Sequence, residues 1–303
     1  LHEVLEICDR ISILRAGEIV GDADPKTASN KELASMMVGR PVNLSLDRTT
    51  SKPGNTLLEV RGLSVLNEKQ DTAVSNISFN VKEGEILGVA GVQGNGQTEL
   101  IDAITGLRPK LSGKILYFGE NMNAISPRKI HQIGIRHIPE DRQKSGIIGN
   151  FTVSENLILN NYYASPYSKN YAMDWSKVND ESEKIIHKFD IRTPSANTLA
   201  ENLSGGNQQK LVVGREMSDD VDFLIASQPT RGIDVGSIEY IHEQLIESRN
   251  HGKGILLVST ELEEILTLSD RIIVLFRGEI IDEFGTNPTP EEIGLAMAGH
   301  PRK

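Results

Sequence analysis

The sequence predicts an α/β fold with a mostly parallel core sheet, an antiparallel β side sheet and a helical subdomain. Short apolar runs alternate with amphipathic helical stretches, as they do when helices cover a parallel sheet. A glycine-rich loop stands between one apolar run and the helix that follows it. Two further apolar runs flank another helical stretch nearer the carboxyl end.

The elements of the main module are predicted in chain order from the spacing of apolar residues and from the glycines between the runs. They are strands over 57–66, 77–81 and 85–90, a helix over 98–107, a mostly helical stretch over 153–211, a strand over 221–227, a helix over 237–250 and a strand over 254–259. The helical subdomain is expected at about 151–211. The opening strands are the ones expected to form the antiparallel side sheet.

Composition narrows the class of protein. The chain has 303 residues, 38% of them hydrophobic and 24% charged, which is ordinary for a globular protein. A net charge of −10 disfavours a nucleic-acid partner, because such proteins usually present a basic face. The single cysteine, Cys8, excludes an internal disulfide and suits a reducing cytosol. No apolar run approaches the ~20 residues that span a bilayer, so any membrane association is expected to run through a partner.

An internal repeat links the two ends of the chain. LHEVLEICDRISILRAGEIVG (1–21) aligns without gaps with LEEILTLSDRIIVLFRGEIID (262–282), and MMVGRP (36–41) aligns with AMAGHP (296–301) after a one-residue slip. The second copy follows some two hundred residues that the first copy lacks. We therefore expect residues 1–41 to be the tail of a first module that has been cut away, 42–56 to be a linker, and 57–301 to be a second module.

The loop GVQGNGQT (91–98) has the pattern of a phosphate-binding loop with one departure. Its glycines and Asn95 allow backbone N–H groups to converge on phosphate oxygens, and the following helix directs its positive end there. The candidate nucleotide-binding residues are Gly91, Gly94, Asn95, Gly96, Gln97 and Thr98. The Thr98 hydroxyl can ligate Mg²⁺, but Gln97 replaces the usual lysine. A plain glycine turn before a helix is the alternative interpretation.

A second motif, LSGGNQQ (203–209), combines a helix-capping serine with two glycines, which makes another site for an anion. It closely resembles the signature motif of ABC-type ATPases, in the form found in simple-sugar and nucleoside importers. The order of motifs along 57–301 also resembles the ABC order. The resemblance implies an ABC ATPase cassette that binds ATP and Mg²⁺, with a signature formed by Ser204, Gly205, Gly206, Asn207 and Gln208, and implies that 1–41 ends a preceding cassette.

Several positions depart from the pattern of that family. Ser227 and Gln228 stand where the family has an Asp that helps hold Mg²⁺ and a Glu that polarises water. Serine is a weak ligand for Mg²⁺, and glutamine cannot act as a general base. Thr260 replaces the switch histidine, and Glu140 occupies the Q-loop position. Asp234 keeps the D-loop, although a turn aspartate is the plainer interpretation. We expect the chain's own site to be slow or inactive, with no intact catalytic residue.

The resemblance also implies where the chain acts and with which partners. In ABC proteins two cassettes face each other, and each ATP lies between one phosphate loop and the other cassette's signature. We expect this chain to complete the ATP site of the missing N-terminal cassette. It would belong to the ATP-binding subunit of a bacterial importer for simple sugars or nucleosides, peripheral at the cytoplasmic face of the membrane. Its partners would be transmembrane permease subunits and, indirectly, an extracytoplasmic solute-binding protein.

Two other functions stay open on the sequence alone. One is a regulatory cassette that holds nucleotide without a catalytic partner. The other is a soluble ABC-type ATPase acting on ribosomes or DNA, which the acidic balance and the lack of basic runs weigh against. The transported substrate cannot be predicted from these motifs, because the ATPase subunit contacts the permease and not the cargo.

Overall fold

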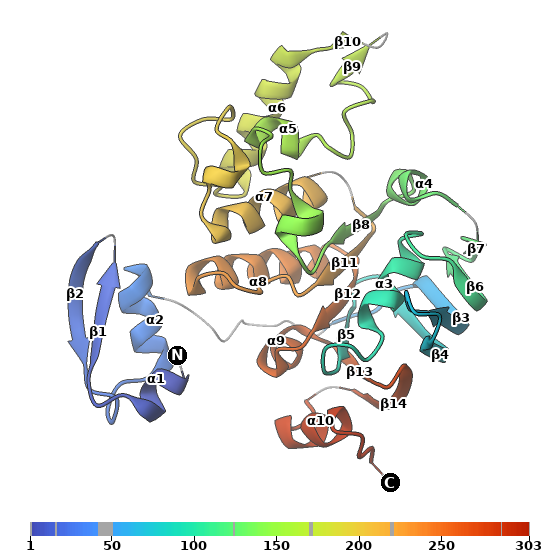
Figure 1. Ribbon diagram of the computed structural model, residues 1–303, viewed down its shortest axis with the longest axis horizontal. Coiled ribbons are helices and arrows are strands. Elements are labelled where there is room, and N and C mark those ends of the chain that lie inside the picture. The colour runs from blue at the N-terminus through green and yellow to red at the C-terminus, as the bar shows by residue number, and fades with distance from the viewer. Residues whose placement is uncertain are drawn as a thin grey trace.

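The computed structural model describes residues 2–15, 17–41, 51–123, 125–169, 172–218, 221–285 and 287–302. Its centre is a six-stranded sheet in the order β14–β13–β5–β12–β11–β8 (Figure 1). The strands β13, β5, β12, β11 and β8 run parallel, and β14 is antiparallel at the edge. The bounds of these strands are β5 Ile86–Ala90, β8 Ile135–Ile138, β11 Phe223–Ser227, β12 Gly254–Ser259, β13 Arg271–Phe276 and β14 Glu279–Phe284. The predicted mostly parallel core is confirmed.

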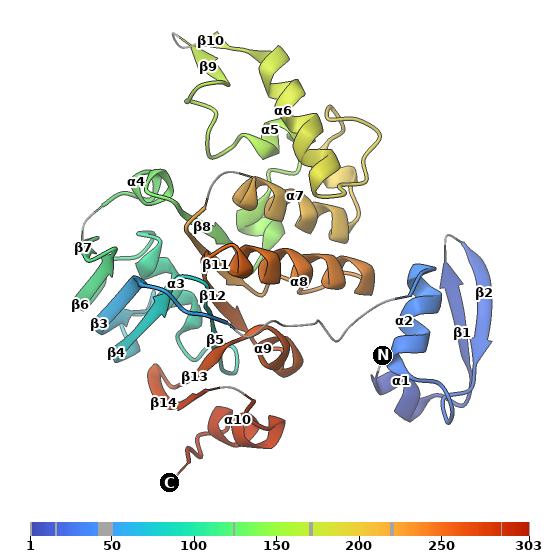
Figure 2. The same cartoon turned by 180° about the vertical axis from the view of Figure 1, so that it is seen from behind.

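Both faces of this sheet are buried, which explains why its strands are continuous apolar runs. Successive side chains of a strand point to opposite faces. Leu87 and Val89 of β5 therefore enter the core on one face, while Ile86 and Ala90 enter the core on the other. The first face carries a four-stranded antiparallel sheet and α3 (Gln97–Ile104), and the second carries α8 (Val235–Asn250), α9 (Leu262–Leu268) and α10 (Pro290–Met297) (Figures 1 and 2).

The antiparallel sheet has the order β4–β3–β6–β7 and confirms the predicted side sheet. Its strands are β3 Thr56–Leu66, β4 Thr72–Lys82, β6 Lys110–Tyr117 and β7 Glu120–Asn121, and α4 Pro127–Gln132 follows them. The strand predicted over 77–81 begins five residues earlier, because 72–76 also pair with β3. The helix predicted over 98–107 ends at Ile104, where the positive φ of Gly106 stops it.

The stretch predicted to be mostly helical over 153–211 is helical in part only. It contains α5 Val153–Leu157, α6 Trp175–Lys188, a 3₁₀ turn Ala200–Asn202 and the first half of α7 Gly205–Met217. Between α5 and α6 lies a small hairpin of β9 Ser168–Lys169 and β10 Ala172–Met173. The segments joining these elements are irregular and are held by side-chain bonds, for example from Arg192 N to Asn207 Oδ1 at 2.8 Å. A π-helical turn, Arg142–Gly146, precedes the stretch.

The two copies of the repeat fold alike. Residues 2–38 form α1 His2–Ile7, β1 Ile11–Arg15, β2 Glu18–Ala23 and α2 Asn30–Val38, the same order as α9, β13, β14 and α10. The β1–β2 hairpin has the register of β13–β14 at a constant offset, and both registers shift after the third residue pair. Leu33, Ile11 and Ile13 form the small core of this N-terminal unit.

The N-terminal unit lies at one side of the molecule, where α2 meets the first turns of α8 (Figures 1 and 2). Arg40 Nη1 pairs with the buried carboxylate of Glu239 at 2.7 Å. Residues 42–50 of the predicted linker lie outside the described residues. Its end is anchored, since Ser51 Oγ donates to Gly84 O at 2.6 Å and Gly54 N donates to Glu83 O at 2.9 Å. None of the helices in the described ranges has the length and apolar character needed to cross a membrane.

Candidate functional site

The phosphate loop joins β5 to α3 at the carboxyl end of the parallel sheet. Gly91 follows the strand, Gly96 is the N-cap residue of α3, and Gln97 is its first helical residue. Asn95 fixes the loop to the β13–β14 turn, because Arg277 N donates to its Oδ1 at 2.7 Å and Gly278 N donates to its carbonyl at 3.0 Å. Strand, loop and helix thus have the arrangement expected of a phosphate cradle.

Gln97 lies inside this loop and does not extend from it. Its Oε1 accepts a hydrogen bond from Asn95 N at 3.1 Å, and its Nε2 donates to Val92 O at 3.1 Å. The side chain is buried. One carboxamide therefore satisfies both a donor and an acceptor of the loop, and one of the N–H groups that would face a phosphate already has a partner.

Gln228 follows β11 and Thr260 follows β12, and these two uncharged side chains face each other. Ser227 ends β11, and Gln228 follows it with a φ of 47°. The Oε1 of Gln228 accepts bonds from Thr260 N at 3.4 Å and from Thr260 Oγ1 at 3.3 Å. The structure therefore brings together the three substituted positions that the sequence singles out, and it supplies no carboxylate among them.

Glu140 connects two loops around the site. Its Oε1 accepts from Gln93 Nε2 of the phosphate loop at 3.0 Å and from Arg231 Nη1 at 2.7 Å. Glu140 thus places a negative charge next to the phosphate loop, where the resemblance implies a Q-loop.

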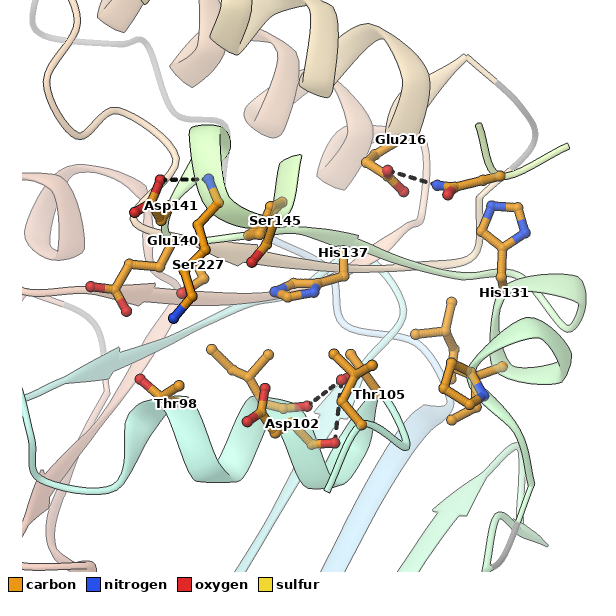
Figure 3. Close-up of a pocket in the computed structure, with 18 of the residues that line it drawn as sticks. Thr98, Asp102, Thr105, His131, His137, Glu140, Asp141, Ser145, Glu216 and Ser227 are labelled. Carbon is orange, nitrogen blue, oxygen red and sulfur yellow. Dashed lines mark hydrogen bonds between the residues drawn. The ribbon is translucent and has the colours of Figure 1, made fainter. Parts of the chain in front are cut away.

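A cavity of about 600 Å³ opens between α3, β8 and the helical subdomain. Figure 3 shows Thr98 on the α3 side of the cavity, with Ser227 and Glu140 on the opposite wall. His137 also lines it, and its Nε2 is buried with no hydrogen-bond partner among the described residues. Burial lowers the pKa of His137, because it disfavours the charged imidazolium. The imidazole therefore stays neutral at pH 7.

The signature residues form the start of α7. Ser204 is the N-cap residue, and its Oγ accepts from Asn207 N at 3.4 Å and from Asn207 Nδ2 at 2.9 Å. Gln208 Nε2 donates to Ala200 O at 3.1 Å and holds the preceding turn. Ser204 is exposed and Gly206 is buried. We call Ser204–Gly206 the signature tip; its serine is open to a ligand, and it stands at the positive end of a 13-residue helix.

Asp234 caps α8 and supports the signature tip. Its Oδ1 accepts from Ser237 N at 3.0 Å, and its Oδ2 accepts from Ser237 Oγ at 2.9 Å. A Cβ added to Gly206 would lie 2.5 Å from Asp234 Oδ2. Asp234 is therefore the N-cap residue of α8, and its carboxylate also lies against Gly206.

Comparison with known proteins agrees with this arrangement. The sequence profile described as "ABC transporter" matches residues 74–231, just over half of the chain. The chain belongs to the ABC transporter family. Its fold is that of solved cassettes: it superposes on a nucleotide-free ATP-binding cassette from an ABC transporter with a TM-score of 0.67 at 23% identity, covering 80% of this chain and 96% of that one.

Three curated ABC proteins match almost the whole chain. They are the guanosine import ATP-binding protein NupO of Bacillus subtilis (46% identical, 98% of this chain), the nucleoside import ATP-binding protein NupA of Lactococcus lactis (41%, 99%) and the ribose import ATP-binding protein RbsA of Clostridium tetani (39%, 96%). The chain spans only 58%, 59% and 57% of their respective lengths.

The cassette fits the phosphates of a nucleotide better than it fits a divalent metal ion. The backbone of the loop and the start of α3 suit phosphate. For Mg²⁺ the chain offers the hydroxyl of Thr98 and the neutral Ser227, although this hard cation prefers carboxylates. In the described ranges no three or more His, Cys, Asp or Glu side chains cluster as metal ligands. The donor set therefore does not match that of a hydrolytic Mg²⁺ site.

The sequence prediction missed two arginines at this cassette's site. Arg231 pairs with Glu140, and Arg142 donates from Nη1 to Arg231 O at 2.9 Å. Both arginines lie beside motifs that the sequence does reveal, within HIPEDR (137–142) and QPTRGID (228–234). The sequence shows where the two arginines are. Their pairing could not be predicted, because it requires two loops some ninety residues apart to meet at the sheet edge.

Proposed function

We propose that this chain is part of the ATP-binding subunit of a bacterial ABC importer for simple sugars or nucleosides. The subunit couples ATP binding and hydrolysis to transport. The names of the matching proteins support this substrate class, since they import guanosine, nucleosides and ribose. The subunit would bind transmembrane permease subunits at the cytoplasmic face of the membrane, with a solute-binding protein delivering the cargo outside.

Within that subunit, we propose that the chain's own site is degenerate and that its signature completes the ATP site of a partner cassette. This proposal rests on the contrast between the Gln228–Thr260 pair and Ser204. Gln228 and Thr260 are neutral and bond to each other, so no general base stands there. Ser204, by contrast, is exposed at a helix start, as a residue that binds a phosphate from another cassette must be.

The partner cassette is proposed to precede this one in the same polypeptide, with residues 1–41 as its tail. Burial in the two copies of the repeat supports this. Ile7 and Leu14 are 78% and 66% exposed, while their counterparts are fully buried, Leu268 at the end of α9 and Leu275 in β13 of the core sheet. Within the described residues, the N-terminal unit thus exposes apolar side chains at positions that are buried in the second copy.

The test is Ser204→Ala in the full two-cassette protein. We expect ATP hydrolysis to fall by roughly 10²-fold, because one positioned donor to developing phosphate charge is lost. The steady-state ATPase rate and uptake of labelled nucleosides and pentoses are the measurements. Ser218→Ala is the matched control, since Ser218 stands at the other end of α7 and donates to Arg215 O of its own helix. Undiminished ATPase and uptake in the Ser204 variant would show that the signature does not serve a working site.

A further inference from the structure

We infer that Arg142 is the positioning residue that fixes the signature tip against the D-loop. The inference rests on the proposed function, because a positioned tip matters only if a partner's nucleotide binds it. It goes beyond that function by naming the side chain that holds the tip in place. Three segments meet at this guanidinium: the π-helical turn that contains Arg142, the D-loop turn at 231–232, and Gly205 at the tip.

The contacts of the guanidinium define the junction. Arg142 Nη1 donates to Arg231 O at 2.9 Å, and Nη2 donates to Gly232 O at 3.3 Å. A Cβ on Gly205 would lie 2.7 Å from Nη2 of Arg142 and 3.5 Å from Gly232 O. The guanidinium therefore lies directly against the backbone of the tip while it bonds two carbonyls of the D-loop.

The backbone of Arg142 is itself anchored to the helix that carries the tip. Asp141 Oδ1 accepts from Gln143 N at 2.9 Å and from Lys144 N at 3.0 Å, which fixes the start of the turn. At the end of the turn, the buried Arg215 of α7 donates from Nη1 to Gly146 O at 2.7 Å. Because both ends of the turn are held, the side chain of Arg142 can fix the position of the tip and does not merely fill space.

Arginine is the side chain that this geometry requires. Its planar guanidinium presents N–H groups in a fixed fork, so two adjacent carbonyls can be bonded at once. A lysine ammonium at the same place would carry the charge, but it is a compact group on a flexible stem. It would not fix both carbonyls and the tip relative to one another. Charge and geometry can therefore be separated by experiment.

The same junction connects the tip to the chain's own phosphate loop. Arg142 binds the carbonyl of Arg231, while Glu140 binds the guanidinium of Arg231 and also Gln93. The D-loop turn is thus held through its main chain and its side chain by one tripeptide, Glu140–Arg142. A nucleotide at this chain's own loop would act on Gln93, and through this path on the tip.

The test uses Arg142→Ala and Arg142→Lys in the full two-cassette protein. We expect kcat for ATP hydrolysis to fall roughly tenfold or more in both variants, because small misplacement of a positioning group is costly. Amide hydrogen exchange should become faster at 203–209 and 231–236 and stay unchanged at 86–90. Arg61→Ala is the control, since Arg61 is an exposed arginine of the side sheet paired with Glu59.

The outcomes separate this inference from the proposed function. Restoration of kcat by lysine, a kcat within twofold of wild type, or unchanged exchange at 203–209 would each overturn the role of Arg142. Retained activity in Ser204→Ala would instead overturn the shared signature, and the exchange measurement would still decide whether Arg142 holds the tip. If the alanine variant does not unfold cooperatively, Arg142→Gln, which keeps a donor without the charge, replaces it in the same assays.

Discussion

At the scale of single residues, the uncharged side chains of the site bond to neighbouring groups of the protein. Gln97 bonds to Asn95 N and Val92 O within its own loop, and Gln228 bonds to Thr260. Each substituted side chain therefore bonds to another group of the protein. A charged side chain at the same position would instead interact with nucleotide or water. Two net hydrogen bonds in the loop are worth about 1 to 3 kcal/mol, which a phosphate must offset on entering.

Replacing Gln97 by lysine should strengthen nucleotide binding at this loop. The change removes the internal bonds of the carboxamide and adds a charge-assisted bond to phosphate, which is roughly twice as strong as a neutral one. We expect the Kd for ATP to fall about tenfold, equivalent to ~1.4 kcal/mol. Titration with a fluorescent ATP analogue measures this. Gln244→Lys on α8 adds the same charge away from the loop and should leave the Kd nearly unchanged; an equal effect of both variants would contradict the prediction.

At the scale of elements, the repeated hairpin shows how one local structure serves two surroundings. Gly17 and Gly278 occupy the same turn with φ of 86° and 82°. Gly278 O accepts from Ser75 N at 2.8 Å, and Gly278 N bonds the phosphate loop. A Cβ on Gly278 would lie 2.4 Å from Ala73 O, whereas one on Gly17 would meet nothing within 4 Å.

Alanine at these two turns should therefore have unequal effects. Gly17→Ala should cost about 1 to 2 kcal/mol from left-handed backbone strain alone. Gly278→Ala should cost a further 1 to 3 kcal/mol, because backbone atoms must move apart. Hydrogen exchange gives the free energy of opening for each hairpin separately. Equal losses in the two hairpins would show that contact with the side sheet contributes nothing.

The elements also show what the sequence could predict. The parallel core was predictable because both of its faces are buried, which leaves unbroken apolar runs such as 254–259. The structure of the stretch 153–211 was not predictable. The amphipathic spacing near Val178 and Ile185 indicates a helix, but it does not reveal the hairpin before that helix or the loops that side-chain bonds hold. The inward position of Gln97 comes from bonds within its own loop, which a motif pattern does not show. The bonds of Arg142 depend on contact between loops that are distant in the sequence. The signature tip was predictable because Ser-Gly-Gly before a helix is a local signal.

At the scale of the whole molecule, the chain holds two halves of different sites. Its phosphate loop and its signature tip belong, in the proposed function, to two separate nucleotides. The Arg40–Glu239 pair and the α2–α8 contact join the N-terminal unit to the helix that Asp234 caps. In the proposed two-cassette protein, a change in the preceding cassette would therefore reach the D-loop of this one through α2 and α8.

The 303-residue chain by itself should bind ATP weakly and hydrolyse it barely above background. Gln228 cannot act as a general base, and in the proposed function the phosphate loop that faces its signature belongs to another cassette. Phosphate release with Mg²⁺ present, compared with the two-cassette protein at equal concentration, is the measurement. Brisk Mg²⁺-dependent turnover by this chain would contradict the degenerate site. Equal, negligible rates in both would favour a regulatory cassette.

The β1–β2 hairpin has a consequence for handling the chain in solution. In β13 the side away from β14 is hydrogen-bonded to β5, whereas within the described residues β1 pairs with β2 alone. The free edge of β1 therefore offers a row of backbone donors and acceptors beside exposed Leu14, and such an edge recruits other strands. Concentrated samples of this polypeptide are expected to self-associate along that edge, and a charged residue at position 14 should keep them dispersed.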